Sequence, residues 1–287
     1  MMLRQKGRRL AAVILTAVTA VTAMGGCRSV KTNGAPSLPV QPESLLIVGD
    51  SIAEGYMDKT NGETGVDSEA CFGALLKKAW NLPDDGYHNN AVSGWTTEDL
   101  VNRLDDVTEG VGEPQVIAVS AGGNDVLRPL LRDAELMVTL AGLITGTDGQ
   151  GPHSVWDSLA EKAKELSGKA AYTAAVDGMK QNLDAVLQSL TRLFPDSFIV
   201  VQTLYNPLDR SESLSVAIPL IDKVNAALRE TAEKYDRVRI LDVAAAFAGH
   251  GAVYLSSDFI HPNRTGHERL AGLYEEWWHS ETAEASR

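Results

Sequence analysis

The stretch LLIVGDSIAEGY, Leu45 to Tyr56, begins with four apolar residues and breaks at Gly49. A short apolar run that ends in glycine is typical of a buried strand, and the residues after it are compatible with a helix. The stretch therefore predicts a strand, a turn and a helix, as at the start of an α/β domain. Ser51 lies at the turn. It is either the N-cap of the helix, a position that favours serine, or an exposed nucleophile at the edge of a sheet.

The same alternation continues along the chain. Further strands are predicted from the apolar runs at 87–92, 114–122, 196–204 and 237–243. Helices are predicted from the apolar spacing at 67–80, 96–104, 172–193, 213–235 and 263–279. Alternating strands and helices predict a three-layer α/β/α fold, with a central parallel sheet between two layers of helices. Ligand sites in such sheets lie at the carboxyl ends of the strands.

The N-terminal residues predict export. Residues 1–26 are basic at first, then apolar over a short run, then small, which is the order of a secretory signal peptide. Cys27 directly follows two glycines, and MGGC resembles the lipobox of bacterial lipoproteins. This resemblance implies that Cys27 is acylated and anchors the protein at the extracytoplasmic face of a membrane. The alternative is an ordinary signal peptide that leaves Cys27 free.

Two further segments concern domain organisation. Residues 27–43 are rich in proline and small polar residues, which predicts a tether before a single folded domain at 44–287. Residues from about 130 to 168 are longer than one crossover between strands needs, and they contain the loop sequence GTDGQGP. We expect this insertion to form either a helical lobe over the site or two more packing helices.

Charge and cysteine content narrow the class of protein. The formal net charge of −12 argues against nucleic-acid binding, which needs a basic surface. The chain has two cysteines. Because Cys27 is assigned to the lipid anchor, Cys71 has no disulfide partner, and its apolar neighbours at helical spacing predict a buried thiol rather than a reactive one.

A serine nucleophile needs a base within hydrogen-bond reach, and the base needs an acceptor that orients it. The best of the six histidines is His261, which Asp258 precedes by three residues and Pro262 follows. The Asp258 carboxylate can fold back onto Nδ1 of His261 and leave Nε2 for Ser51. Taken alone, the same spacing also fits a capping turn with an exposed histidine.

Donors for a developing oxyanion are also present. Gly94 follows the strand at 87–92, and Asn124 follows the strand at 114–122 in SAGGNDV. Each has a simpler interpretation, since glycines make turns and Asn124 can cap a helix. Three strand ends nevertheless deliver Ser51, Gly94 and Asn124 to one edge of a sheet, and this coincidence favours a catalytic site.

Four short blocks, in this order, resemble the motifs of the SGNH (GDSL-type) hydrolases: Gly49-Asp50-Ser51-Ile52, Gly94, Gly122-Gly123-Asn124-Asp125 and Asp258-Phe259-Ile260-His261-Pro262. The resemblance extends from Leu45 to about Trp278, and LYNPL at 204–208 is similar to bacterial lipoprotein-type members. Ile52 stands where the family usually has leucine. The insertion is larger than in minimal members, so the substrate site does not follow from them.

The resemblance implies a flavodoxin-like fold and hydrolysis of acyl esters through an acyl-enzyme. It implies Ser51 as nucleophile, His261 as general base and Asp258 as the residue that orients it. The oxyanion hole would combine the backbone N–H groups of Ser51 and Gly94 with the Asn124 side chain. Asp50 and Asp125 would be structural hydrogen-bonding residues. No metal or organic cofactor is implied.

The substrate class stays open at this point. Lipid esters, glycan esters and small esters all suit an exported, anchored enzyme, including a carbohydrate O-acetylesterase or a thioesterase. Trp95 and Tyr205 are candidates for the wall of a substrate pocket, although Trp95 can equally pack against a helix start. The alternative of another class is a non-catalytic surface lipoprotein that binds glycan or lipid on a hydrolase fold.

Overall fold

The computed structural model describes residues 38–60, 62–131, 165, 168–207, 218–258 and 260–285. The predicted signal peptide, Cys27, most of the tether and most of the insertion at about 130–168 lie outside these residues. None of the helices in the described ranges is long and apolar enough to span a membrane.

A five-stranded parallel sheet forms the middle layer, with the strand order β4-β1-β5-β6-β7. The strands are β1 (Leu45–Gly49), β4 (Tyr87–Asn89), β5 (Val116–Ser120), β6 (Phe198–Gln202) and β7 (Val238–Leu241). All five predicted strands are confirmed. β1, β5 and β6 are buried along their whole length, which is why they are continuous apolar runs rather than alternating ones.

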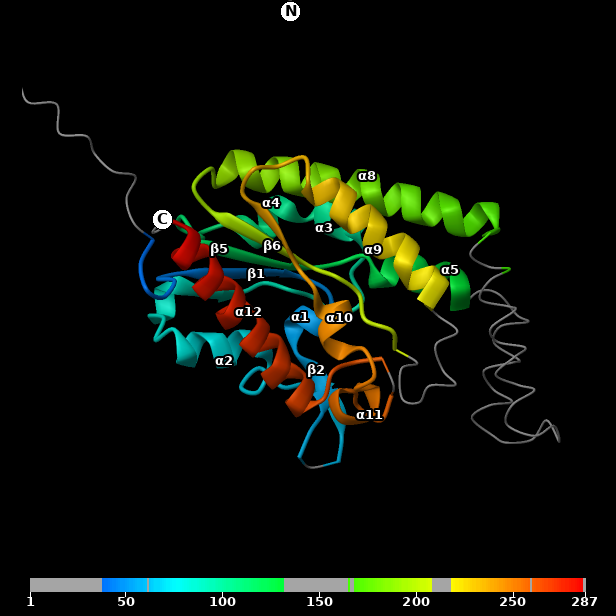
Figure 1. Ribbon diagram of the computed structural model, residues 1–287, viewed down its shortest axis with the longest axis horizontal. Coiled ribbons are helices and arrows are strands. Elements are labelled where there is room, and N and C mark those ends of the chain that lie inside the picture. Colours follow the sequence, from blue (N-terminus) through cyan, green and yellow to red (C-terminus); the bar gives the residue numbers. More distant parts are fainter. Residues whose placement is uncertain are drawn as a thin grey trace, which may run out of the picture. The chain divides into compact units, whose positions relative to one another are not determined.

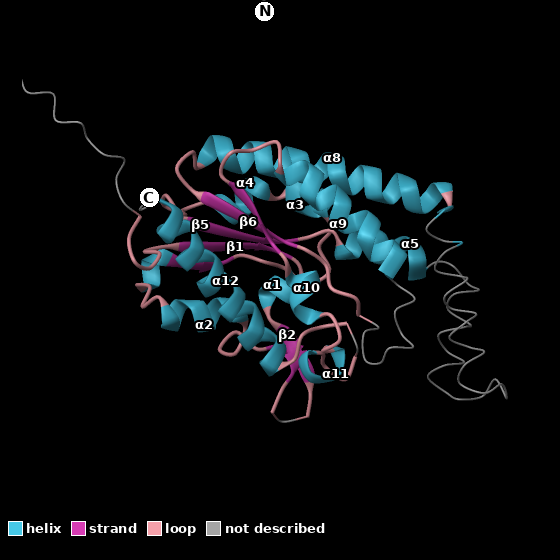
Figure 2. Ribbon diagram, viewed as in Figure 1, coloured by secondary structure: helices cyan, strands magenta, loops and turns pink. Residues whose placement is uncertain are grey.

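Helices cover both faces of the sheet (Figures 1 and 2). Core contacts on one face come from α3 (Thr97–Asn102), α4 (Leu104–Thr108), α5 (Gly123–Leu131), α8 (Ala170–Leu193) and α9 (Ile218–Ala232). On the other face they come from α2 (Phe72–Ala79), α10 (Val243–Phe247) and α12 (Arg264–Ala285). The three-layer α/β/α prediction is therefore confirmed.

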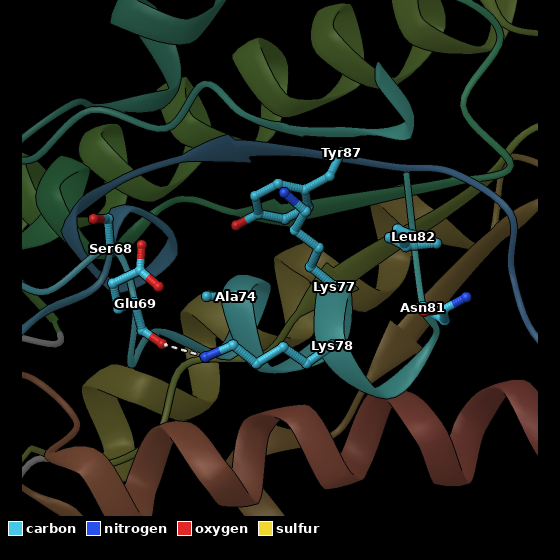
Figure 3. A pocket seen from close by; sticks show the side chains of 8 residues that line it. All are labelled: Ser68, Glu69, Ala74, Lys77, Lys78, Asn81, Leu82 and Tyr87. Carbon is cyan, nitrogen blue, oxygen red and sulfur yellow. Dashed lines mark hydrogen bonds between the residues drawn. The ribbon is translucent and has the colours of Figure 1, made fainter. Parts of the chain in front are cut away.

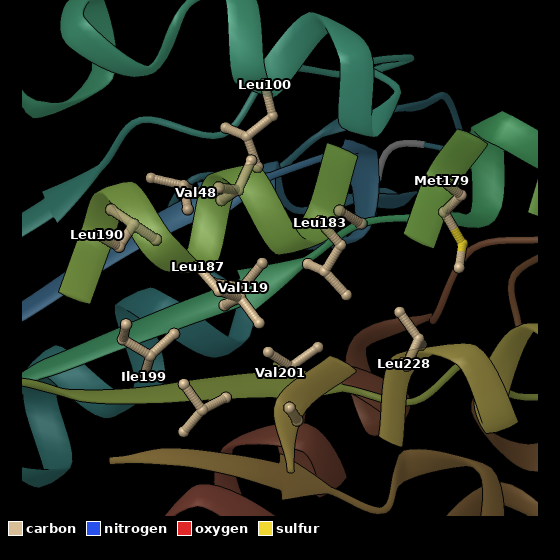
Figure 4. Packing of buried hydrophobic residues seen from close by; sticks show 14 of the residues in the cluster. Val48, Leu100, Val119, Met179, Leu183, Leu187, Leu190, Ile199, Val201 and Leu228 are labelled. Atoms are coloured by element: carbon tan, nitrogen blue, oxygen red, sulfur yellow. The ribbon is translucent and has the colours of Figure 1, made fainter. Parts of the chain in front are cut away.

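Alternation along each strand divides the core between these two layers. Val48, Val119 and Val201 pack under α8 and α9, as Figure 4 shows, whereas Ile47 and Val200 point to the face covered by α2 and α12. Successive strand side chains point to opposite faces, so one strand supplies both clusters. The carboxyl ends of β1 and β5 are thereby fixed side by side, with Gly49 in register with Ser120.

Local sequence signals explain where two of the predicted helices begin. Thr96 caps α3 through a capping box, in which its side chain accepts from the Asp99 N–H and the Asp99 carboxylate accepts from the Thr96 N–H. α2 begins at Phe72, later than the pattern at 67–80 predicts. The Asp67 carboxylate accepts hydrogen bonds from the N–H groups of Glu69 and Ala70, and this turn replaces the first helical residues.

The sequence interpretation missed an antiparallel hairpin of β2 (Tyr56–Asp58) and β3 (Thr64–Val66). The helix predicted after β1 is confirmed as the short α1 (Ser51–Glu54), whereas α11 (Gly251–Tyr254) was missed as a separate element. Strands of three residues are too short to show a period of two. Only Gly55 separates α1 from the hairpin, so the hairpin begins close to Ser51 in the sequence.

Candidate active site

Ser51 is the first residue of α1, immediately beyond the carboxyl end of β1. The N-cap is Asp50, whose side chain accepts a hydrogen bond from the Ile52 N–H at 3.1 Å. The N-cap interpretation of Ser51 is therefore wrong, because its neighbour has that role. α1 has only four residues, so it fixes the place of the Ser51 side chain without adding a long helix dipole.

The residues before Ser51 pack tightly against the end of β5. A Cβ on Gly49, which has φ of 139°, would lie 1.9 Å from the Ser120 carbonyl oxygen, so only glycine fits there. Asp50 is buried; its N–H donates to the Ser120 carbonyl at 3.0 Å, and its Oδ1 accepts from Ser120 Oγ at 2.9 Å. Burial raises the pKa of Asp50 to about 6, although the hydrogen bonds from Ser120 and Ile52 oppose this shift. We call Gly49, Asp50, Ser51 and Ser120 the nucleophile arm.

His261 approaches Ser51 from the connection between α11 and α12. Its Nε2 lies 2.8 Å from Ser51 Oγ, and its Nδ1 lies 2.7 Å from Asp258 Oδ2. Asp258 Oδ1 accepts from the backbone N–H groups of Ile260 and His261 at 2.9 and 3.0 Å. We call residues 255–258 and 260–262 the acid–base loop.

The assignment of the His261 tautomer follows from these partners. An ionised carboxylate can only accept, so the proton is on Nδ1, and Nε2 is left to accept from the Ser51 hydroxyl. Partial burial acts to raise the pKa of Asp258, but the hydrogen bonds from the His261 backbone, the His261 side chain and Ile260 hold it below its usual value. Asp258 is therefore ionised at neutral pH.

Gly94 and Asn124 belong to a third group, which is linked to the nucleophile arm by a 3.0 Å hydrogen bond from the Val92 N–H to the Gly49 carbonyl. Gly94 has φ of 82° in a turn that the Trp95 N–H closes onto the Val92 carbonyl at 3.2 Å. Asn124 Nδ2, in the first turn of α5, donates to the Trp95 carbonyl at 2.9 Å. One turn later, Arg128 donates to the Gly94 carbonyl at 2.7 Å. The turn is thus fixed to α5 from two sides.

The other residues singled out from the sequence have structural surroundings. Asp125 accepts hydrogen bonds from the N–H and the hydroxyl of Thr97, as expected for a structural residue. Trp95 is partly buried against the core under α8, in agreement with the packing alternative. Tyr205 is only 6% exposed, stacks on Phe247 and donates from its hydroxyl to the Ile260 carbonyl at 2.5 Å. Tyr205 therefore supports the acid–base loop from its buried side. Cys71 is buried, as predicted.

Two residues near the site were missed together with the hairpin. The Tyr56 ring lies against the His261 ring, with 4.5 Å between their centroids, and Asp58 accepts hydrogen bonds from Ser257. The Asn61-Gly62 pair is a strong hairpin signal, and it would have predicted the hairpin that carries Tyr56 and Asp58.

A pocket of about 360 Å³ lies elsewhere, lined by α2, by residues just before and after α2 and by Tyr87 of β4 (Figure 3). Its lysines have partners: Lys77 pairs with Asp84 at 2.6 Å, and Lys78 donates to the Glu69 carbonyl at 3.5 Å. None of its lining residues belongs to the groups around Ser51. Within the described ranges, no cluster of three or more His, Cys, Asp or Glu side chains is arranged to hold a metal ion.

Comparisons with solved structures show the same fold. Phospholipase A1 from Streptomyces albidoflavus NA297 is 17% identical, with a TM-score of 0.56 over 82% of this chain and 99% of that chain. The extracellular lipase from Streptomyces rimosus is 18% identical, with a TM-score of 0.56 over 81% and 98%. The lipase Lip_vut3 from a goat rumen metagenome is 19% identical, with a TM-score of 0.54 over 81% and 96%. No curated protein matches the sequence.

The family comparison is more specific than these structural likenesses. The model of the GDSL-like lipase/acylhydrolase family matches residues 47–269, which include the nucleophile arm, the Gly94 turn, Asn124 and the acid–base loop. The chain therefore belongs to the GDSL-like lipase/acylhydrolase family and is a carboxylic ester hydrolase of the GDSL type.

Proposed function

We propose that this hydrolase cleaves acyl esters through a covalent acyl-enzyme on Ser51, with His261 as general base and Asp258 as its orienting carboxylate. The observation that carries the proposal is the continuous hydrogen-bonded chain from Ser51 Oγ through both ring nitrogens of His261 to Asp258. A serine, a base and an orienting acid in this geometry are what nucleophilic catalysis requires.

The reaction has two halves. His261 Nε2 takes the Ser51 proton while Oγ attacks the ester carbonyl, and the resulting imidazolium gives that proton to the leaving alcohol. Water then attacks the acyl-enzyme, with His261 again taking a proton and returning it to Ser51 Oγ as the acid leaves. Asp258 keeps Nδ1 protonated and stabilises the imidazolium in both halves.

The oxyanion formed in each half needs donors close to Ser51. We assign the backbone N–H groups of Ser51 and Gly94 and the Asn124 amide. Asn124 Nδ2 carries two N–H groups, and donation to the Trp95 carbonyl uses only one of them. The clamping of the Gly94 turn onto α5 supports the assignment, since oxyanion donors act best when they are held in advance.

The substrate proposal is an ester with an apolar acyl chain. Val92 and Ile260 are 38% and 41% exposed, and they are close in sequence to Gly94 and next to His261, respectively. Exposed apolar side chains beside a site favour an apolar ligand. A phospholipase A1 and two lipases share the fold and are in line with lipid esters.

The test is a panel of p-nitrophenyl esters of increasing acyl length, acetylated glycans, acyl thioesters and lysophospholipids, measured on the wild type and Ser51→Ala. We expect turnover of acyl esters by the wild type and a loss of about 10⁴-fold or more in Ser51→Ala, with an unchanged melting temperature. Ser68→Ala, an exposed serine away from the site, is the matched control. Turnover that survives in Ser51→Ala would contradict the mechanism. Binding of glycan or lipid without turnover would favour the non-catalytic alternative.

We further propose that the enzyme is a lipoprotein held at the extracytoplasmic face of a membrane through Cys27. The MGGC sequence after a signal-like segment supports this proposal. Cys27→Ser should move the protein from the membrane fraction to the soluble fraction with its specific activity retained. A Cys27→Ser protein that still sediments with membranes would contradict the anchor.

A further inference from the structure

The β2–β3 hairpin presents one face to the acid–base loop. Tyr56 and Asp58 alternate with Met57 along β2, so they point to the same side and Met57 to the other. Met57 is buried in a small cluster with Ala70, Cys71 and Ala74. The hairpin is therefore anchored on one side by packing, and its other side is available for contacts with the loop.

Asp58 makes three hydrogen bonds to two consecutive residues of the loop. Its Oδ2 accepts from the Ser257 N–H at 2.6 Å, and its Oδ1 accepts from Ser257 Oγ at 2.9 Å. The Asp58 N–H donates to Ser256 Oγ at 3.0 Å. Residues about 200 positions apart in the chain are thus held together by a charged acceptor, which makes stronger hydrogen bonds than a neutral one.

A shift of Ser256 and Ser257 would be passed on to the catalytic side chains, because the loop is closed on itself. The Ser256 N–H donates to the His261 carbonyl at 2.8 Å, and Ser256 Oγ donates to the Pro262 carbonyl at 3.2 Å. Leu255 and Pro262 form an isolated β-bridge at its base. Asp258 follows Ser257 directly, so the Asp58 contacts end one residue before the acid of the triad.

We propose that Asp58 is a positioning residue, which sets the distance between the nucleophile and its base by fixing the acid–base loop to the segment that carries Ser51. Ser51 and Asp58 are joined by α1, by Gly55 and by the first residues of β2. One short stretch of chain therefore holds the nucleophile at one end and the loop at the other. Tyr56, between them, packs against the His261 ring.

The inference rests on the proposed mechanism. It is tested by the hydrolysis of p-nitrophenyl acetate, because so small an ester depends little on an acyl pocket. Asp58→Ala should lower kcat on the order of 10²-fold, the cost of a misplacement of about 1 Å, with KM changed by less than about 2-fold. Asp58→Asn should recover kcat to within about 10-fold of the wild type, because Oδ1 can still accept from the Ser257 N–H while Nδ2 donates to Ser257 Oγ. Ser257→Ala, which loses one of the hydrogen bonds, should lower kcat by about 5-fold.

Thr64→Val is the matched control. It removes the 3.2 Å hydrogen bond from Thr64 to Asp58 Oδ1 within the hairpin, but none of the contacts to the loop, and its kcat should equal that of the wild type. A double-mutant cycle provides a second readout. If Asp58 acts only through the Asp258–His261 pair, Asp58→Ala should cost much less in an Asp258→Asn background than in the wild type.

Three results would overturn the inference. The first is a wild-type kcat in a folded Asp58→Ala variant. The second is an Asp58→Asn variant that is as slow as Asp58→Ala, which would assign the effect to the charge of Asp58. The third is additive losses of kcat in the double-mutant cycle. If Asp58→Ala does not fold, an unchanged kcat in Ser257→Ala overturns it instead. Failure of the mechanism itself would be detected separately, as turnover that persists in Ser51→Ala.

Discussion

Ser51 Oγ and His261 Nε2 lie 2.8 Å apart, yet the two residues are held in place by different parts of the structure. The nucleophile arm lies at the carboxyl end of the sheet: the Asp50 N–H is hydrogen-bonded to the end of β5, the Asp50 side chain is buried, and no side chain fits at Gly49. The acid–base loop lies outside the sheet. It is held by hydrogen bonds within the loop, by the hydrogen bond that Tyr205 donates to Ile260 and by the hydrogen bonds that Asp58 accepts from Ser257.

This difference indicates where changes will act. Damage to the contacts of Gly49, Asp50 and Ser120, as distinct from the reactive Ser51 hydroxyl, disturbs the pairing of β1 and β5, so it should appear first as lost stability. Damage at Ser257, Asp258 or His261 of the acid–base loop leaves the core clusters intact, so it should appear first as lost turnover. The two regions can therefore be separated by measuring the free energy of unfolding and kcat on the same variants.

Within the acid–base loop, the largest effect on turnover is expected from Asp258→Asn. The amide donates to Nδ1 instead of accepting from it, so His261 takes the tautomer that cannot accept the Ser51 proton, and kcat should fall about 10⁴-fold. Asp105→Asn, an exposed change in α4, is the control for both kcat and urea unfolding. A large loss of stability in Asp258→Asn would contradict the separation of the loop from the core.

The reverse pattern is expected from Gly49→Ala. The new Cβ meets the Ser120 carbonyl and the backbone is strained at a φ of 139°, so unfolding should be easier by about 3–5 kcal/mol. Gly110→Ala has a φ of 70° but no atom within 4 Å of its Cβ, and it should cost only about 1 kcal/mol. Equal costs for the two variants in urea titrations would mean that the close approach to β5 has no energetic weight.

Asn124→Ala tests whether α5 acts with the nucleophile arm in catalysis. Loss of an oxyanion donor should lower kcat about 10²–10³-fold and change KM little. Asn102→Ala, exposed at the end of α3, is the control. A raised KM with an unchanged kcat would instead assign Asn124 to substrate binding.

The smallest effect is a difference in how the two regions respond to pH. The pKa of Asp50 is about 6, above the ordinary 3.8, so the folded protein gains stability by protonating it as the pH falls through 6. Burial lowers the pKa of His267, which contacts α2 from α12, from 6.5 to about 4, so stability is lost as the pH falls over that interval. The two trends oppose each other in the wild type.

Asp50→Asn keeps both hydrogen bonds to Oδ1 and removes only the first trend. Between pH 7 and pH 4 its free energy of unfolding should fall by about 2 kcal/mol relative to the wild type. Urea titrations at several pH values measure this difference. Parallel curves for the two proteins would refute the raised pKa of Asp50.

The sequence predicted the nucleophile arm better than the surroundings of the acid–base loop. β1 and β5 are continuous apolar runs, and a run of this kind is visible within one short segment of the sequence. Asp258 and His261 were found because they are only three positions apart, so their contact is local. The contact of Asp58 with Ser257 crosses most of the chain, and nothing near either residue indicates the other.

The misassigned helix cap has a similar cause. Serine and aspartate are both good caps, and propensity alone does not decide between neighbours. The choice of Asp50 depends on its burial beside Ser120, which belongs to another strand. Tertiary contacts thus decided a question that local preference left open.

Because Asp50 caps α1, the side chain at position 51 has no part in starting the helix. The helix therefore tolerates a different reactive group at that position. A Ser51→Cys enzyme would keep the geometry of the turn while presenting a thiol, whose acyl thioester could accumulate long enough to be weighed by mass spectrometry. Mixtures of natural esters could then be screened by the acyl group that the protein itself retains.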